Sequence, residues 1–346
     1  MDREQRNKKY RKNLYQQAYS RFQSMLAIGE SKHQGMKDGS AYGKIYSYST
    51  YQAYWKSVKY YIAWLKERHP EVRSMKKARR YVNEWLQERS DQLDPEGNPR
   101  YSAWTLSLDA AALNKYYQVT PDDPERYTPP QRHRYDIKRS RGPAERDKHF
   151  SARNNAELIE FCRGTGARRG ALQELTGDDL WSRARMEVAL EDFWTSGSRE
   201  TQRIVALQDA LTSFPDQDYF VLFARDKGGR SRYAPVIGGN KQQIVDRFRD
   251  TPRDGKVWQY VSSNADIHSY RSDYATALYR SMARDIKDIP YDRINAGTGK
   301  RYQGDVYTCR GDEAGKKLDR RAMLLASKAL GHNRIDVIAN NYLRGL

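Results

Sequence analysis

A proline-bearing stretch that turns strongly basic interrupts the chain, and it limits what these 346 residues can fold into. Proline fixes φ and lacks a backbone donor, so neither a helix interior nor a central strand runs through several prolines in close succession. The stretch opens with Pro121, Pro124, Pro129 and Pro130. A chain of this length can build two sizeable cores. We therefore predict a helical domain over residues 1–120, a basic linker over 121–153 and a second domain over 154–346.

The first domain has the apolar spacing of helices and contains no convincing strand. We expect helices over residues 3–28, from Ser49 or Thr50 to Pro70, from about Ser74, and from Ser102 to Tyr116 or Tyr117. Serine and threonine at these starts are good N-caps. The glycine-bearing residues between the first two helices are predicted to form a loop.

The second domain combines helices with a hairpin. Two predicted strands, residues 218–223 and 231–236, are joined by a glycine-rich turn over 226–230. Helices are expected at 156–164, from Gly170, at 266–282, at 317–330 and shortly before Tyr342, with a further helical insertion at 182–212. The predicted fold class is mainly α with a small antiparallel sheet.

The charge balance favours a polyanionic partner. Lys and Arg number 62 against 44 Asp and Glu, a formal net charge of +18, which suits nucleic acid, although a solubilising surface or a ribosome-like binder would also fit. The two cysteines, Cys162 and Cys309, give neither a disulfide framework nor the spacing of a metal site. The sequence has no apolar run near the length of a membrane span and a charged start instead of a signal peptide, so we expect a soluble cytoplasmic protein without a membrane partner.

Five clusters in the second domain supply groups that suit a phosphodiester. Arginine forks match its delocalised charge, and a tyrosine can attack phosphorus and hold the product covalently. In chain order the clusters are Thr165-Gly166-Ala167-Arg168, Lys227 in its glycine-rich turn, His268 with Arg271, Leu330-Gly331-His332, and Tyr342. Each alone is common by chance, since a hairpin lysine is usually solubilising and any one of 26 tyrosines is usually structural. Arg169 follows Arg168 directly, and the sequence leaves open which of the two faces inward.

The chain resembles the tyrosine recombinases, or phage-type integrases, in the content and order of these clusters. The family pattern is Thr-Gly-x-Arg, a hairpin Lys, His-x-x-Arg, Leu-Gly-His and Tyr. By this resemblance the catalytic residues are Arg168, Lys227, His268, Arg271, His332 and the nucleophile Tyr342. Tyrosine would form a 3′-phosphotyrosyl link, and Lys227 would protonate the departing oxygen. The resemblance also implies a helical core-binding domain followed by a mixed α+β catalytic domain.

The resemblance further implies the partners. These are double-stranded DNA recombination sites bound by a homo-tetramer, with an accessory DNA-bending or excision factor as a further candidate, for a mobile element in a prokaryote. No metal, ATP or other cofactor is expected. Among the many basic residues, the candidates for DNA contact are Arg132, Arg134, Lys138, Arg139, Arg141, Arg230 and Arg232. The alternatives are a type IB topoisomerase, a telomere-resolving enzyme, or a DNA-binding protein without catalysis.

The sequence departs from the family pattern at several points. The gaps between Arg168 and Lys227 and between His268 and His332 are long, which implies insertions near residues 182–212 and 290–316. Ala171 stands where the family often has an acidic residue, three positions after the first arginine. Only four residues follow Tyr342, whereas many relatives use a longer tail to dock on a neighbouring subunit.

Overall fold

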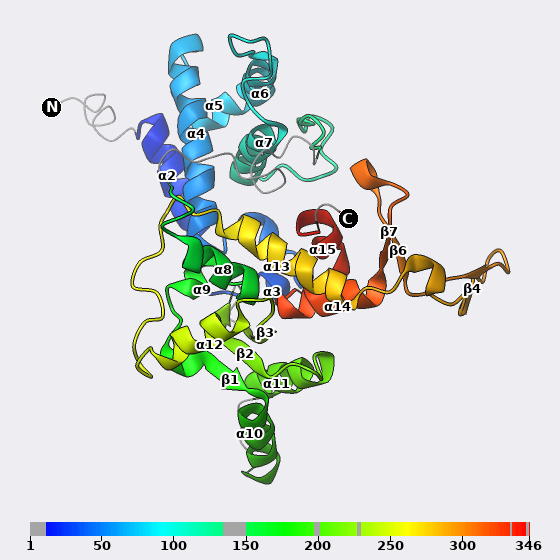
Figure 1. Ribbon diagram of the computed structural model, residues 1–346. Coiled ribbons are helices and arrows are strands. Elements are labelled where there is room, and N and C mark those ends of the chain that lie inside the picture. The colour runs from blue at the N-terminus through cyan, green and yellow to red at the C-terminus, as the bar shows by residue number, and fades with distance from the viewer. Residues whose placement is uncertain (1–11, 134–149, 197–200, 227–229, 333, 344–345) are drawn as a thin grey trace. The chain divides into compact units, whose positions relative to one another are not determined.

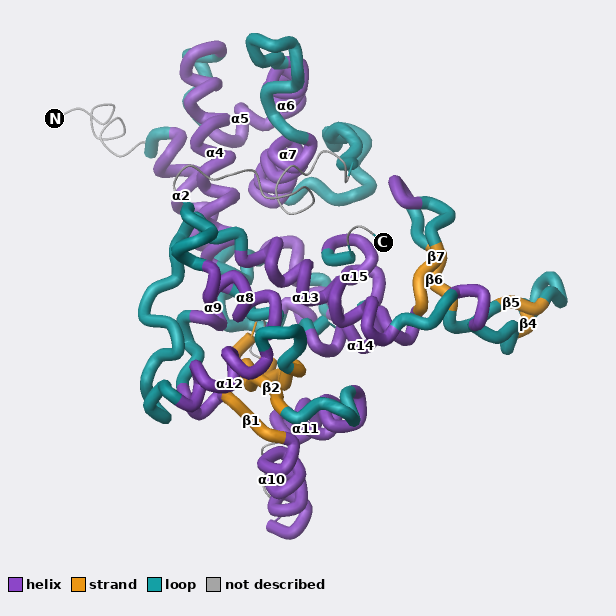
Figure 2. The backbone as a smooth tube through the Cα atoms, viewed as in Figure 1, coloured by secondary structure: helices purple, strands orange, loops and turns teal. Residues whose placement is uncertain are grey.

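The computed structural model describes residues 12–133, 150–196, 201–226, 230–332, 334–343 and 346. The chain divides into two compact units, Met1–His133 and Arg134–Leu346. Both are built mainly from helices, and the strands form small antiparallel sheets in the second unit (Figures 1 and 2). Within the described ranges, no helix is both long enough and apolar enough to cross a membrane.

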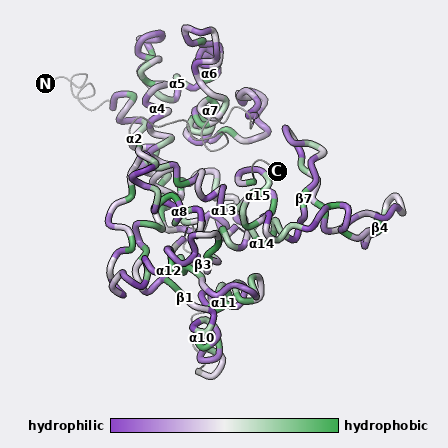
Figure 3. The backbone as a smooth tube through the Cα atoms, viewed as in Figure 1, coloured by the Kyte–Doolittle hydropathy of each residue, from purple (hydrophilic) through white to green (hydrophobic). Residues whose placement is uncertain are grey.

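The first unit is a set of helices around one apolar core. Its helices are α2 (Leu14–Ser24), α3 (Lys32–Lys37), α4 (Tyr48–Arg68), α5 (Met75–Ala78), α6 (Val82–Asp91) and α7 (Ala103–Tyr117). The core takes Phe22 from α2, Ile62 from α4, Trp85 from α6 and Leu113 from α7. Hydrophobic and hydrophilic residues are interspersed along these helices in Figure 3, as expected where one face of each helix is buried.

Local capping decides where several of these helices begin. Ser102 caps α7 as predicted, because its side chain accepts the N–H of Thr105. For α4 the capping residue is Ser47, which lies just before the predicted Ser49 or Thr50. The predicted loop after α2 contains the short helix α3, because the Ser31 side chain accepts the N–H of Gln34 and starts a helical turn there.

The second unit surrounds a three-stranded sheet with helices. In chain order its elements are α8 (Ala156–Thr165), α9 (Arg169–Leu172), β1 (Leu180–Ser182), α10 (Arg183–Ser196), α11 (Thr201–Ser213), β2 (Tyr219–Asp226), β3 (Arg230–Pro235), α12 (Lys241–Arg249), α13 (Ile267–Met282), β4 (Arg293–Ile294), β5 (Arg301–Tyr302), β6 (Val306–Thr308), β7 (Lys317–Asp319), α14 (Arg320–Ala329) and α15 (Ile335–Asn341). The antiparallel sheet has the order β1-β2-β3, and β4–β5 and β6–β7 form separate ribbons.

Strand β2 separates two cores. Its alternate residues point to opposite faces of the sheet, as in any strand. Phe220 and Leu222 join a core with residues of α11, α13, α14 and α15. Val221 and Phe223 join another core, with residues of α8 and α12. The predicted hairpin therefore forms the centre of this unit.

Two predictions about this unit were wrong in detail, and one strand was not predicted. The helix expected over 317–330 starts at Arg320, because residues 317–319 pair with 306–308 as strand β7 and Asp319 then caps α14. The helix expected from Gly170 is the single turn α9. Strand β1 was not predicted, and it exists because residues 180–182 pair with β2. Strand β1 pairs with residues far along the chain, which local propensity does not encode, whereas β6 and β7 are consecutive strands.

Candidate active site

Two buried guanidiniums join the C-terminal ends of α8 and α14. The carbonyl of Gly166, just after α8, accepts hydrogen bonds from Arg271 and, at 3.2 Å, from Arg232 Nη2. Arg232 Nη1 donates to Ala329 O at 2.6 Å, and Arg271 Nη2 donates to Leu330 O. The last carbonyls of a helix lack intrahelical partners and form the negative end of its dipole, so cations are favourable there. This linkage brings the residues that follow each helix together.

Two glycines allow that close approach. Gly166 has φ +61°, and a Cβ there would lie 2.5 Å from the ring of Tyr274. Gly331 has φ +67°, and a Cβ there would lie 2.8 Å from Arg232 Cδ. The left-handed region is costly for other L-residues. Gly331 and His332 also cap α14, since their N–H groups bond to Lys328 O and Ser327 O.

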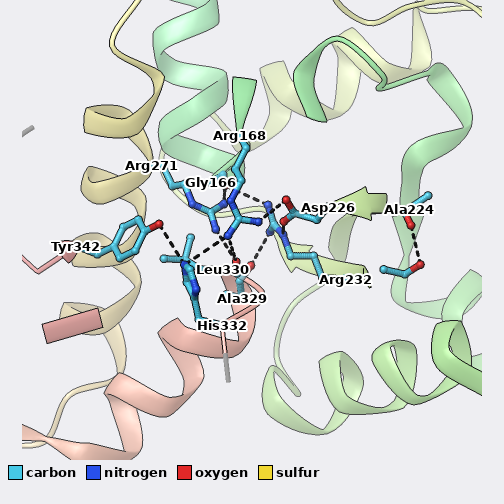
Figure 4. Close-up of polar contacts among 11 residues, drawn as sticks. Gly166, Arg168, Ala224, Asp226, Arg232, Arg271, Ala329, Leu330, His332 and Tyr342 are labelled. Atoms are coloured by element: carbon cyan, nitrogen blue, oxygen red, sulfur yellow. Dashed lines mark hydrogen bonds and ion pairs between the residues drawn. The ribbon is translucent and has the colours of Figure 1, made fainter. Parts of the chain in front are cut away.

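A buried carboxylate, Asp226, lies inside this cluster of cations. It accepts from Arg232 Nε at 2.6 Å through one oxygen and pairs with Arg168 through the other. Burial would raise the pKa of Asp226, but the charges of Arg232 and Arg168 and their hydrogen bonds outweigh it and hold the pKa well below its usual range. Asp226 is therefore ionised, and it gives the two guanidiniums a common anionic partner (Figure 4).

Arg168 is the more accessible of the two arginines that pair with Asp226. Its side chain is 21% exposed, whereas that of Arg232 is 5% exposed. Its Nη2 lies 3.4 Å from Leu330 O and 3.5 Å from His332 Nε2. Arg169 points elsewhere and donates to carbonyls of the loop 262–265. Arg168, and not Arg169, is thus the arginine of this turn that faces the cluster.

Tyr342 lies beside these cations, at the C-cap of α15. Its hydroxyl is 3.1 Å from His332 Nε2, and the guanidinium carbon of Arg271 lies 5.7 Å from its ring centroid (Figure 4). The ring of His268, one turn before Arg271 on α13, lies edge-on to the Tyr342 ring, with the two ring centroids 5.2 Å apart. Tyr342 is 5% exposed. The phenol is therefore held among two imidazoles and a guanidinium.

His332 is neutral in this setting. Its burial, and then the charges of Arg271, Arg168 and Arg232, lower its pKa to about 4. The Tyr342 hydroxyl and Arg168 Nη2 both approach Nε2 as donors. We infer from these partners that Nε2 is the acceptor and that the ring proton is on Nδ1. A neutral Nε2 can accept the phenolic proton of Tyr342.

Arg271 retains an unused donor. Only 1% of the residue is exposed, and burial, followed by the charge of Arg232, lowers its pKa to about 9, which leaves it charged at neutral pH. Its buried Nε has no hydrogen-bond partner among the described residues. Unpaired buried donors are uncommon in proteins and costly.

A cavity of about 120 Å³ also lies against Asp226, Arg232 and His332, on the side of α11.

The structure therefore brings together Arg168, His268, Arg271, His332 and Tyr342. Lys227, Arg134, Lys138, Arg139 and Arg141 lie outside the described residues. Of the other residues that the sequence assigned to DNA contact, Arg132 and Arg230 are exposed. Arg232 is buried instead, and its three donor nitrogens bind Asp226, Ala329 O and Gly166 O, so the prediction that it contacts DNA was wrong.

Sequence reasoning missed Asp226. The available signal was its position directly before Lys227 at the start of the glycine-rich turn. Among the described residues, no group of three or more His, Cys, Asp or Glu side chains is arranged to hold a metal ion. No protein-family model matches the chain, and no curated protein matches it significantly.

Proposed function

We propose that the protein is a tyrosine recombinase of the phage-integrase type, which cleaves and rejoins DNA through a 3′-phosphotyrosyl intermediate. The observation that carries the proposal is the position of the Tyr342 hydroxyl, 3.1 Å from His332 Nε2 and beside Arg271. Tyr342 ends α15, His332 follows α14 and Arg271 lies on α13. Arg168, in the turn between α8 and α9, joins them from a further segment. Arg168, whose side chain is 21% exposed beside these groups, is the guanidinium that an incoming phosphate would reach, and such forks match a phosphate well.

The chemistry follows from these groups. Tyr342 Oη attacks phosphorus, and neutral His332 accepts the phenolic proton. The new bond joins the phenolic oxygen to phosphorus, and the bond from phosphorus to the 5′-oxygen breaks. Arg168 and Arg271 stabilise the negative charge that develops on the phosphoryl oxygens. In this proposal Lys227 gives the leaving oxygen its proton, and a 5′-hydroxyl of another strand reverses the step to complete exchange.

The two units take different parts in the proposal. The helical first unit is the core-binding domain, and the second unit is the mixed α+β catalytic domain. Both bind double-stranded recombination sites, and four copies act together on two sites. The setting we propose is integration and excision of a mobile element in a prokaryotic cytoplasm, with an accessory DNA-bending factor as a further partner. The net charge of +18 is consistent with DNA as the partner.

The test is covalent capture on a nicked suicide duplex, resolved on a denaturing gel. The wild-type protein should form an adduct with labelled DNA, and Tyr342→Phe should bind the same duplex without forming one. Arg271→Ala should lose the adduct as well, because it removes transition-state charge. Tyr279→Phe is a matched control: this phenol, on α13, donates no hydrogen bond to the cluster and accepts the N–H of Asp319.

Two results would redirect the proposal. An adduct that persists in Tyr342→Phe would reject Tyr342 as the nucleophile. Binding without any adduct in the wild-type protein would favour a non-catalytic DNA-binding protein. Relaxation of a supercoiled plasmid that has no paired sites would favour a topoisomerase.

A further inference from the structure

The ribbon formed by β4 and β5 is a fully exposed projection of the second unit. In Figure 1 it extends from the region after α13, away from α8. Every residue from 290 to 302 is exposed. These include three large apolar side chains, with Tyr291 at 59%, Ile294 at 67% and Tyr302 at 47% exposure. A two-stranded ribbon that buries so little is only marginally stable in water. Core packing therefore does not explain why the chain forms it.

The ribbon is held firmly despite that exposure. At its base, Gln303 Nε2 donates to Ile286 O and Ile289 O, both at 2.7 Å. At its tip, the Asn295 side chain accepts the N–H groups of Gly297 and Thr298. An element that is already ordered loses less entropy when it binds a partner. The ribbon therefore has the preorganisation of a binding element.

The strand register distributes charge over both faces of the ribbon. Arg293 pairs with Tyr302 and Ile294 pairs with Arg301, and directly opposite residues of an antiparallel pair share a face. Each face thus presents one cation beside one apolar side chain, and Lys300 adds a third cation next to the tip. Within the described residues, no ion pair engages these three cations.

The acidic side chain of the ribbon, Asp292, forms no ion pair with these cations within the described residues, although the charge of Arg293 contributes, after the N–H of Gly304, to lowering the pKa of Asp292. Asp292 accepts the N–H of Gly304 at 2.9 Å and so serves the turn at the base. Arg293, Lys300 and Arg301 are therefore presented to a partner, with one acidic residue against them in 290–302. Three apolar side chains divided over two faces are too few for the buried core of a protein interface. A two-stranded ribbon does fit the major groove of duplex DNA.

We propose that the β4–β5 ribbon contacts duplex DNA, with Arg293, Lys300 and Arg301 on backbone phosphates and the flanking tyrosines and Ile294 against the groove wall. This contact rests on the proposed function, because it enlarges the DNA surface of the same enzyme beyond the site around Tyr342. It also assigns a role to part of the insertion between His268 and His332.

The test measures DNA affinity as a function of salt in a Tyr342→Phe background, where cleavage does not intervene. The charge variant combines Arg293→Gln, Lys300→Gln and Arg301→Gln. Neutralising phosphates releases counterions, so each lost contact lowers the slope of log affinity against log salt by about 0.9. We expect the slope to fall by roughly 2–3 and the affinity to fall by about tenfold or more.

The matched control removes the same charge from cations that already have acidic partners. Arg249, Arg253 and Lys256 lie near Asp246, Asp178 and Glu174, respectively. Their triple glutamine variant should keep the wild-type slope. An equal fall in this control would show a general effect of net charge and would overturn the proposal.

A third variant separates DNA from a second protein copy as the occupant. Tyr291→Ser, Ile294→Ser and Tyr302→Ser keep the charge, so this variant should keep most of the salt slope. An unchanged slope in the charge variant, with loss of self-association in the apolar variant, would assign the ribbon to a protein interface instead.

If the wild-type protein forms no adduct on the suicide duplex while the ribbon effect persists, the enzyme proposal fails and the DNA contact stands.

Discussion

Asp226 is the residue that most changes the chemistry expected of the site. Its carboxylate holds Arg168 and Arg232 where an incoming phosphate would compete for Arg168, the more exposed of the two. The same contact fixes the orientation of the Arg168 guanidinium. The carboxylate therefore opposes the binding of an anion, and at the same time it positions Arg168, the guanidinium that would bind that anion.

Asp226→Asn should separate these two effects. Removing the charge raises the net positive charge of the site, so DNA affinity should stay equal or rise. The rate constant of adduct formation should fall by about 100-fold, since a misplaced catalytic group has losses of this order. Single-turnover cleavage at several DNA concentrations measures both quantities. Asp254→Asn, an exposed carboxylate with the same charge change, is the control and should change neither. A fall in both affinity and rate for Asp226→Asn would indicate a merely structural role.

His332 should titrate far below an ordinary histidine. Its pKa of about 4 lies below the usual 6.5, so the unfolded chain gains a proton at a pH where the folded chain does not. The stability contribution is therefore complete above pH 6.5 and is lost as the pH falls from 6.5 towards 4. Between about pH 7 and pH 5, the free energy of unfolding should fall by roughly 1–2 kcal/mol more in the wild-type protein than in His332→Gln. Urea unfolding of both proteins at the two pH values checks this, and equal falls would contradict the neutral His332.

The linkage of α8 to α14 should depend on Gly331. Gly331→Ala forces a left-handed residue to carry a Cβ, and that Cβ would meet Arg232 Cδ at 2.8 Å. We expect a loss of roughly 1–3 kcal/mol of stability and lower adduct formation, because Arg232 must move. Gly170→Ala is the control, since a Cβ at this position in α9 meets nothing within 4 Å and should be neutral or slightly stabilising. Thermal unfolding of the two variants decides the matter, and equal melting temperatures would refute the role of Gly331.

The elements that could be predicted from sequence are those with local causes. The Ser102 cap, the hairpin of β2 and β3, and the helix from Asp266 each follow from neighbouring residues. Strand β1 could not be predicted, because its pairing partner β2 follows it in the chain only after α10 and α11. In the site, the order of the motifs predicted which groups lie together. The roles of Asp226 and Arg232 depend on buried contacts with Arg168, Gly166 and Ala329 that no local pattern specifies.

The two units have separate apolar cores. The core of the first unit is made from α2, α4, α6 and α7. The cores of the second unit lie on the two faces of β2. A compact unit with its own core can unfold as a cooperative whole. The full chain should therefore show two thermal transitions, and a change inside one core should shift only one of them.

A fragment of residues 1–133 tests this independence directly. It contains every element of the first core, so it should be helical by circular dichroism and should unfold cooperatively near one of the two transitions of the full chain. A fragment of residues 1–101 is the control, because it lacks α7 and with it Leu106, Ala110, Leu113 and Tyr116, all of them buried. Losing several buried side chains of this size removes several kcal/mol, which is comparable with the whole stability of a small domain, so the shorter fragment should lack a cooperative transition. Gly331→Ala in the full chain should lower only the other transition. A single transition that moves as a whole in Gly331→Ala, together with an unfolded 1–133 fragment, would mean that the first unit depends on the second for its stability.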